Sequence, residues 1–101
     1  MENFHKACLV NEIAANSSKV VEINGEEIAI FNLNGNFYAL TNTCPHRGGP
    51  LGEGAIEGET VTCPWHGWNF CIKDGKNPNM PQISAKSIPL KVEGDSILVS
   101  V

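Results

Sequence analysis

Short runs of apolar residues alternate with polar residues along most of this chain, and turn residues separate the runs. Two Asn-Gly pairs, Asn24-Gly25 and Asn34-Gly35, each lie between such runs. This dipeptide readily adopts the positive φ angles of a two-residue hairpin turn. The flanking runs therefore predict three antiparallel strands, at residues 20–23, 28–31 and 37–40.

The second half of the chain repeats this pattern in shorter pieces. Residues 60–62 and 69–72 have the composition of short strands. Residues 87–92 and 96–101 alternate with period two and flank the turn residues Gly94-Asp95, which predicts a closing hairpin. Together the runs predict an all-β fold, an antiparallel sandwich or barrel of short strands.

The remaining segments predict turns and very little helix. Asp74-Gly75 is a further turn signal, and residues 76–81 contain two prolines without any strand or helix period, which predicts a stiff surface loop. Only residues 9–15 have a helical period, and it is weak. A chain of this length supports one modest core, so residues 1–101 are expected to form a single domain.

Charge and composition exclude several classes of function. The net charge is −4 and the seven basic residues are scattered singly, which argues against binding to nucleic acid. No apolar run is long enough for a signal-peptide core or a membrane span. We therefore expect a cytoplasmic protein without membrane association. In that reducing compartment, cysteines clustered with histidines are expected to bind metal, and the four cysteines are not expected to form two disulfides.

Two short stretches of the chain each pair a cysteine with a histidine. The four residues are Cys44, His46, Cys63 and His66. Both stretches lie in turn-rich segments between predicted strands, so two loops, at about residues 43–50 and 62–70, can bring all four side chains to one point. The pattern predicts a metal site with two thiolates and two imidazoles.

The four ligands leave the metal open between zinc and iron. Zinc accepts two Cys and two His at structural sites, so a zinc-stabilised interaction module is one interpretation. Common zinc spacings keep like ligands together, whereas each stretch here holds one of each kind. A mixed stretch is better suited to two irons, one taking a thiolate and the other an imidazole from each loop.

The stretches Cys44-Pro45-His46 and Cys63-Pro64-Trp65-His66-Gly67-Trp68 resemble the Cys-x-His and Cys-x-x-His boxes of the Rieske family. The resemblance covers nearly the whole chain. It implies a Rieske-like β sandwich with a small cluster-binding subdomain of two loops, and one [2Fe–2S] cluster per chain. Cys44 and Cys63 would bind the inner iron, and His46 and His66 the outer iron.

The resemblance also implies a low reduction potential. Respiratory Rieske proteins have a disulfide between the two loops and hydroxyl donors from a Ser and a Tyr. This chain has Gly67 and Trp68 at or near the hydroxyl positions, and it lacks the disulfide cysteines. Because such donors stabilise the reduced cluster, their absence predicts a potential near the low end of the range of roughly −150 to +300 mV.

Several neighbouring residues have open roles. Arg47 either favours the reduced cluster through its charge or is a solvated loop arginine that helps docking. Trp65 and Trp68 shield the cluster, form an apolar docking rim or pack in the core. Pro81 matches the proline-bearing loop, at about residues 76–82, that covers the cluster in the family; Pro78 is the competing candidate.

Nothing else in the sequence suggests catalysis. His5 is the one histidine outside the two pairs, so the chain lacks the two His and one carboxylate of a mononuclear iron site, and it has no nucleotide fingerprint. We expect His5 to be a solvated imidazole ahead of the first strand. Cys8 and Cys71 are expected to be free core cysteines.

The resemblance therefore implies an electron carrier rather than an enzyme. The leading hypothesis is a stand-alone Rieske ferredoxin, monomeric when free, that passes electrons from a flavin reductase to an oxygenase or similar enzyme. Its acidic balance suits basic docking patches on these partners. The alternative is a Rieske-type small subunit of a larger reductase such as assimilatory nitrite reductase, which the sequence separates poorly from the first hypothesis.

Overall fold

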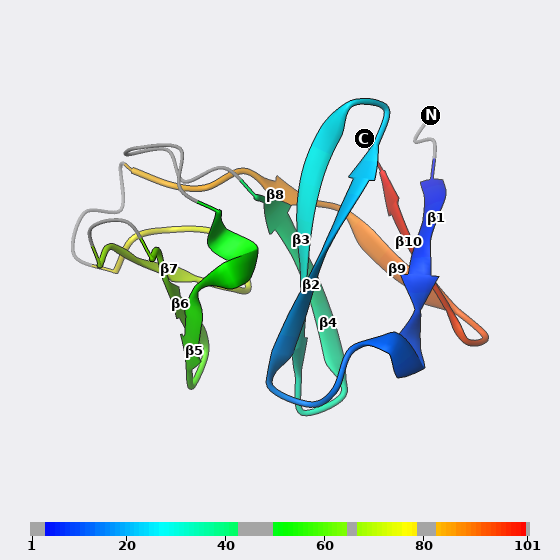
Figure 1. Cartoon of the computed structure of the whole chain (residues 1–101), viewed down its shortest axis with the longest axis horizontal. Helices are drawn as coiled ribbons and strands as arrows, with labels where there is room; N and C mark the ends of the chain where they lie inside the picture. The colour runs from blue at the N-terminus through cyan, green and yellow to red at the C-terminus, as the bar shows by residue number, and fades with distance from the viewer. Residues whose placement is uncertain (1–3, 43–49, 65–66, 79–82, 101) are drawn as a thin grey trace.

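The computed structural model describes residues 4–42, 50–64, 67–78 and 83–100. Within them the chain forms three antiparallel sheets, which lie side by side in Figure 1. The first sheet contains β1 (Phe4–Leu9), β10 (Ser96–Ser100) and β9 (Leu90–Glu93). The middle sheet contains β2 (Ser17–Ile23), β3 (Glu26–Leu33), β4 (Asn36–Thr41) and β8 (Ser87–Ile88). The third sheet contains β5 (Ala55–Glu57), β6 (Thr60–Thr62) and β7 (Asn69–Cys71).

The described helical segments are two single turns of 3-10 helix, at Val10–Glu12 and Leu51–Glu53. The predicted all-β class is therefore confirmed. No helix in the described part of the chain is long and apolar enough to span a membrane.

Both Asn-Gly pairs form the predicted turns of the middle sheet. Asn24 and Gly25 have φ angles of 54° and 81°, and Asn34 and Gly35 have 54° and 93°. The first pair joins β2 to β3 and the second joins β3 to β4, each with a two-residue connection. The three strands predicted from the flanking runs are present and extend further than predicted.

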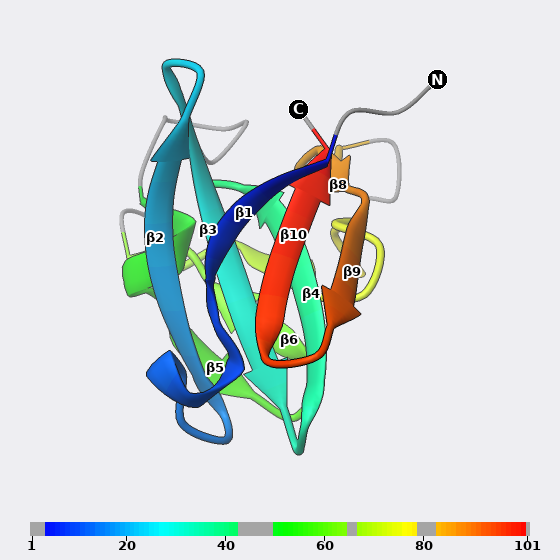
Figure 2. The same ribbon diagram turned by 90° about the vertical axis from the view of Figure 1, so that its right-hand side faces the viewer.

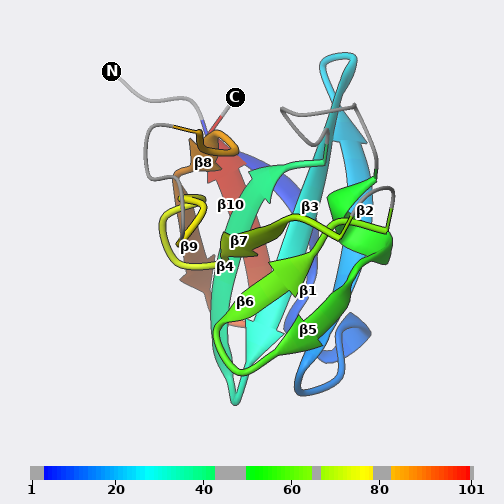
Figure 3. The same ribbon diagram turned by 90° about the vertical axis from the view of Figure 1, so that its left-hand side faces the viewer.

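Strand β3 of the middle sheet is buried on both faces because the first and third sheets cover it from either side. Residues 28–33 of β3 are all buried, and successive side chains point to opposite faces. Ile28 and Ile30 pack toward the first sheet, whereas Phe31 and Leu33 pack toward the third sheet. Figures 2 and 3 show the middle sheet behind the first and behind the third sheet, respectively.

Two apolar cores result from this arrangement. The first-sheet core contains Cys8, Ile13, Ile28, Ile30, Ala39, Ile88, Ile97 and Val99. The third-sheet core contains Ala29, Phe31, Leu33, Leu40, Leu51, Val61, Cys63, Phe70, Ile72 and Ala85.

The C-terminal segment differs from the prediction of one strand over residues 87–92. Pro89 divides it into β8, which pairs with β4 in the middle sheet, and β9, which pairs with β10 in the first sheet. Proline has no N–H to donate to a strand ladder, so the strand ends there and the chain changes sheet. The predicted closing hairpin is present, with Gly94 at a φ angle of 62°.

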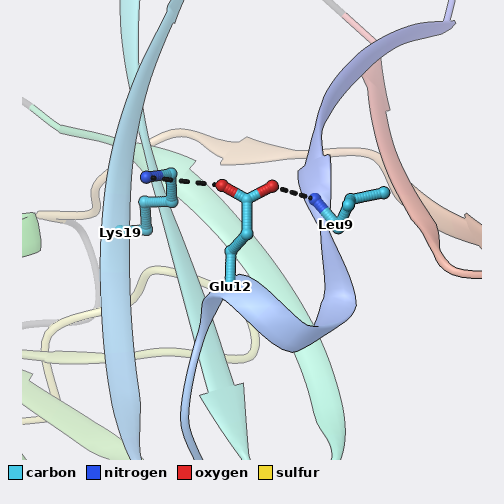
Figure 4. A network of polar contacts seen from close by, with 3 residues as sticks. All are labelled: Leu9, Glu12 and Lys19. Carbon is cyan, nitrogen blue, oxygen red and sulfur yellow. Dashed lines mark hydrogen bonds and ion pairs between the residues drawn. The ribbon is translucent and has the colours of Figure 1, made fainter.

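The N-terminal segment corrects two further expectations. His5 does not precede the first strand; it lies within β1 opposite Val99, with its Nε2 atom 3.5 Å from Nδ2 of Asn24. The weak helical period over residues 9–15 yields only one 3-10 turn. Figure 4 shows how Glu12 anchors this turn, accepting a 2.7 Å hydrogen bond from the Leu9 N–H while its other oxygen lies 3.7 Å from Lys19 Nζ on β2.

The segment predicted as a surface loop is only partly exposed. Lys76 forms an isolated β-bridge with Ser84, and Asn77 is buried, its N–H donating to the Ile83 carbonyl at 3.0 Å. The surface-loop prediction is therefore wrong for Asn77, because backbone pairing draws it inward.

Candidate metal centre

The loop that carries Cys44 and His46 begins after Asn42, and the structure shows how its two ends are joined. The Asn42 carbonyl accepts a 2.7 Å hydrogen bond from the Leu51 N–H, and the Asn42 Oδ1 atom accepts one of 2.7 Å from the Gly52 N–H. Residues on either side of this loop are therefore held together across the gap in sequence.

The loop that carries Cys63 and His66 is the tip of the β6–β7 hairpin. The Cys63 N–H donates to the Trp68 carbonyl at 2.7 Å, and the Gly67 N–H donates to the Cys63 carbonyl at 3.1 Å. One residue pair earlier, the Thr62 hydroxyl donates to Asn69 Oδ1 at 2.7 Å. These bonds fix the backbone of Cys63, whose side chain belongs to the third-sheet core and is only 2% exposed.

The third sheet brings the end of the first loop beside the start of the second. β5 follows the first loop and pairs with β6, so that Ala55 lies opposite Thr62, the residue before Cys63. Gly54 lies so close to the Thr62 carbonyl that any Cβ at that position would overlap it. Figure 3 shows β5 and β6 next to each other in this sheet. The pairing thus places Ala55, at the start of β5, opposite the residue that precedes Cys63.

The predicted site residues divide between described and undescribed positions. Cys63, Gly67, Trp68 and the competing Pro78 are described. The residues outside the described part are Cys44, His46, Arg47, Trp65, His66 and Pro81. Among the described residues no three His, Cys, Asp or Glu side chains come close enough together to hold a metal ion.

The described part of the site fits an iron–sulfur group. Such a centre is held by cysteine thiolates, and Cys63 can supply one: its side chain is shielded from water, and its backbone N–H and carbonyl are both hydrogen-bonded. The mixed thiolate and imidazole donor set is the one that a cluster with two unlike irons needs.

Gly67 and Trp68 have structural roles that the sequence left open. Gly67 is exposed and has a φ angle of 72°, in the left-handed region where glycine has no steric penalty. A serine at this position, which would supply the hydroxyl donor of the respiratory proteins, would be strained in this backbone conformation. Trp68 is half-buried and packs against the third-sheet core, in agreement with the core-packing interpretation.

The two remaining cysteines differ in their surroundings. Cys8 is buried in β1, and burial, with a smaller contribution from the Glu12 carboxylate, raises the pKa of its thiol above the ordinary value of 9.0. Cys71 is only half-buried on β7, so the expectation of a core position is met by Cys8 and only partly by Cys71. Neither forms a disulfide with another described residue.

The sequence alone did not single out the polar residues at the bases of the loops. Asn42 follows directly after an apolar strand, and Thr62 and Asn69 occupy equivalent positions on β6 and β7. A polar residue with both a donor and an acceptor at the end of a buried strand is the signal that could have identified Asn42, because buried polar groups need hydrogen-bond partners.

Comparison with known proteins identifies the family. The sequence profile of the Rieske [2Fe–2S] domain matches residues 3–93. The chain is 35% identical over 98 residues to the biphenyl dioxygenase ferredoxin subunit of Pseudomonas sp. (strain KKS102), an alignment that covers 95% of this chain and 90% of the relative. The chain belongs to the Rieske [2Fe–2S] domain family.

Solved structures agree with this assignment. The ferredoxin of Sphingomonas yanoikuyae B1 superimposes with a TM-score of 0.88 at 26% identity, covering 98% of this chain and 99% of that one. The putative NADH-dependent nitrite reductase small subunit of Mycobacterium tuberculosis superimposes with a TM-score of 0.91 at 23% identity, covering 100% and 96%. The latter likeness shows the fold alone. Relatives that match most of the chain are named as ferredoxin components of dioxygenase systems, and the chain is accordingly an electron-transfer protein rather than an enzyme.

Proposed function

We propose that this chain is a stand-alone Rieske ferredoxin that holds one [2Fe–2S] cluster and delivers single electrons to a terminal dioxygenase. The proposed ligands are Cys44 and Cys63 for the inner iron, and His46 and His66 for the outer iron. The observation that carries the proposal is the buried Cys63 at the base of a hydrogen-bonded hairpin. When bound, such a cluster supplies reversible one-electron transfer.

The chain's own contribution is to hold its ligands still. The backbone of Cys63 is fixed by its bonds to Trp68 and Gly67, and the first loop is closed at Asn42. A rigid ligand frame limits the rearrangement that accompanies a change of charge, which favours rapid electron transfer over chemistry at the metal. This division of labour suits a carrier that leaves oxygen activation to another protein.

The partners belong to the proposal as well. A flavin reductase is proposed as the donor and an oxygenase as the acceptor, which fits the dioxygenase systems named for the relatives. The net charge of −4 favours basic docking patches on both partners. We place the protein in the cytoplasm as a monomer, with no affinity for membranes or nucleic acid.

The cluster itself is tested by chemical analysis and redox titration. A protein expressed with iron and sulfide should be brown and contain two irons and two acid-labile sulfides per chain. It should titrate reversibly with one electron near the low end of the Rieske range of roughly −150 to +300 mV. A colourless protein with a single zinc would refute the proposal, and a midpoint above roughly +100 mV would refute its low-potential part.

The alternative role as a small subunit of a larger reductase is tested separately. A tagged chain expressed in its own host should purify without a stoichiometric large subunit. Stoichiometric recovery of a reductase subunit at moderate salt would favour the alternative, while leaving the cluster and its ligands unchanged.

A further inference from the structure

We propose that Asn42 is a positioning residue for the cluster, because its side chain locks the base of the loop that carries Cys44 and His46. We call Asn42, Leu51 and Gly52 the loop neck. The inference rests on the ligand set proposed above, and it assigns to Asn42 a role toward the cluster without direct contact with iron.

Both polar atoms of the Asn42 side chain are used in the neck. Its Oδ1 atom accepts from the Gly52 N–H at 2.7 Å, and its Nδ2 group donates to Glu27 Oε1 at 3.2 Å. Its backbone N–H donates to the Glu27 carbonyl at 3.0 Å, and its carbonyl accepts from Leu51 at 2.7 Å. Asn42 is 5% exposed, so removing its side chain would leave the Gly52 N–H without its partner in a mostly buried place.

Gly52 shows that this contact is close and specific. A Cβ at Gly52 would overlap Val20 Cγ2 and lie 2.9 Å from Asn42 Oδ1, so only glycine fits against both. The Gly52 carbonyl in turn accepts a 2.6 Å hydrogen bond from the Ser18 hydroxyl on β2. The far end of the first loop is therefore tied to β2 by Ser18 and to the near end by Asn42.

The loop neck affects the cluster because Asn42 is close in sequence to the proposed ligand Cys44. Two peptide bonds separate Asn42 from Cys44, so a neck that opens allows the backbone carrying the thiolate to move. Asparagine suits the position because it offers one acceptor and one donor at once, which Gly52 and Glu27 require. Mutation of residues that orient metal ligands without binding the metal typically lowers metal affinity or activity by about 10–100-fold.

Asn32 provides a matched control elsewhere in the middle sheet. It is 6% exposed, its Nδ2 group donates to the Ile13 carbonyl at 2.9 Å, and its Oδ1 atom accepts from the Gly35 N–H at 2.8 Å. The chemistry is the same as at Asn42, but the turn that Asn32 secures lies at the opposite end of β4 from the first loop.

The test compares Asn42→Ala with Asn32→Ala in the full, cluster-loaded chain. Both should lower the melting temperature. Only Asn42→Ala should release iron to a chelator faster, by about tenfold, shift the electron paramagnetic resonance spectrum of the reduced protein, and speed hydrogen exchange at the Leu51 and Gly52 amides. Asn42→Asp combined with Glu27→Gln, which restores an acceptor for Gly52 and a donor between the two side chains, should return iron release toward the wild-type rate.

Equal iron release and unchanged spectra in the two alanine variants would overturn the inference. Recovery of Asn42→Ala without cluster, beside a loaded Asn32→Ala, would support it. If both alanine variants fail to fold, the same comparison is made with Asn42→Ser and Asn32→Ser. A wild-type chain without a two-iron spectrum would instead refute the proposed function, so the two failures are distinguishable.

Discussion

At the scale of single residues, the atoms whose hydrogen bonds hold the two loops are different from the atoms proposed to bind iron. At Cys63 the backbone N–H and carbonyl bond to Trp68 and Gly67, so the position of the thiol is set by main-chain geometry. At Asn42 a side chain that binds no iron closes the other loop. These hydrogen bonds thus use main-chain atoms and the Asn42 side chain rather than the side chains of the proposed ligands.

Replacing the His46 imidazole by a thiolate should lower the reduction potential of the cluster. His46→Cys is expected to move the midpoint from near −150 mV toward roughly −400 mV, the value of ferredoxins with four thiolates, because a thiolate stabilises the oxidised cluster. Redox titration followed by visible absorption measures the change. His5→Ala, in β1, should leave the midpoint where it was; an unchanged midpoint in His46→Cys would remove His46 from the ligand set.

The buried thiol of Cys8 should make stability fall at alkaline pH. Burial, with the smaller effect of Glu12, raises the pKa of this thiol in the folded chain above 9.0, so below 9.0 the thiol is neutral in both states and its contribution is intact. As the pH rises further, the unfolded chain ionises first and the free energy of unfolding decreases. Urea unfolding between pH 8 and pH 10.5 should show a shallower decline in Cys8→Ala; parallel declines would contradict this origin.

At the scale of elements, close contact between β5 and β6 aligns the two loops. Gly54, the residue before β5, lies so close to the Thr62 carbonyl that a Cβ would overlap it, and Thr62 precedes Cys63. Because the obstructing atom belongs to the backbone, neither strand can yield by a simple rotation of a side chain.

Gly54→Ala should therefore disturb both stability and the cluster. The overlap with Thr62 is expected to lower the free energy of unfolding by about 1–3 kcal/mol and to speed iron release. Gly58→Ala is the control, because Gly58 has a φ angle of 60° but its Cβ would meet nothing within 4 Å. It should cost about 1 kcal/mol from backbone strain and leave iron release unaltered. Equal rates of iron release in the two variants would show that the close approach of Gly54 to Thr62 has no effect on the cluster site.

Sequence patterns predicted the elements that are determined by neighbouring residues, such as the Asn-Gly turns. They missed the elements that depend on pairing with residues far away in the sequence. Asn24-Gly25 and Asn34-Gly35 encode their turns directly. β1 was missed because its partner is β10, at the other end of the chain, and because a bulge between Lys6 and Cys8 interrupts its alternation. The burial of Asn77 likewise depends on a bond to Ile83 that no periodicity records.

The candidate site was predictable to the same extent. The spacing of the Cys and His pairs, with the family resemblance, supplied the ligand set that we propose. The supporting contacts were not predictable, because Asn42 meets Glu27 of β3 and Gly52 of the Leu51–Glu53 turn only in the folded chain. Such contacts link residues that are ten and fifteen positions apart and leave no motif in the sequence.

At the scale of the whole molecule, the middle sheet separates two cores that can be disturbed independently. Ile72 in the third-sheet core and Ile97 in the first-sheet core are both fully buried. Ile72→Ala and Ile97→Ala should each lower the free energy of unfolding by about 2–5 kcal/mol, through lost burial and a residual cavity. Only Ile72→Ala should also speed iron release, because Cys63 belongs to the same core. Identical release rates would indicate that the two cores act as one.

The route of the chain into and out of the third sheet has a consequence for how such proteins diversify. The chain leaves the middle sheet after Thr41 and returns at Ser87, and the Thr41 N–H donates to the carbonyl of the preceding residue, Lys86, at 2.9 Å. The segment between them is thus a block with adjoining ends, which recombination could exchange between relatives as a unit. Deletion of the block would expose Phe31 and Leu40 to water, because both side chains belong to the third-sheet core. We therefore expect an exchanged block to preserve the fold only if it covers these two side chains in the same way.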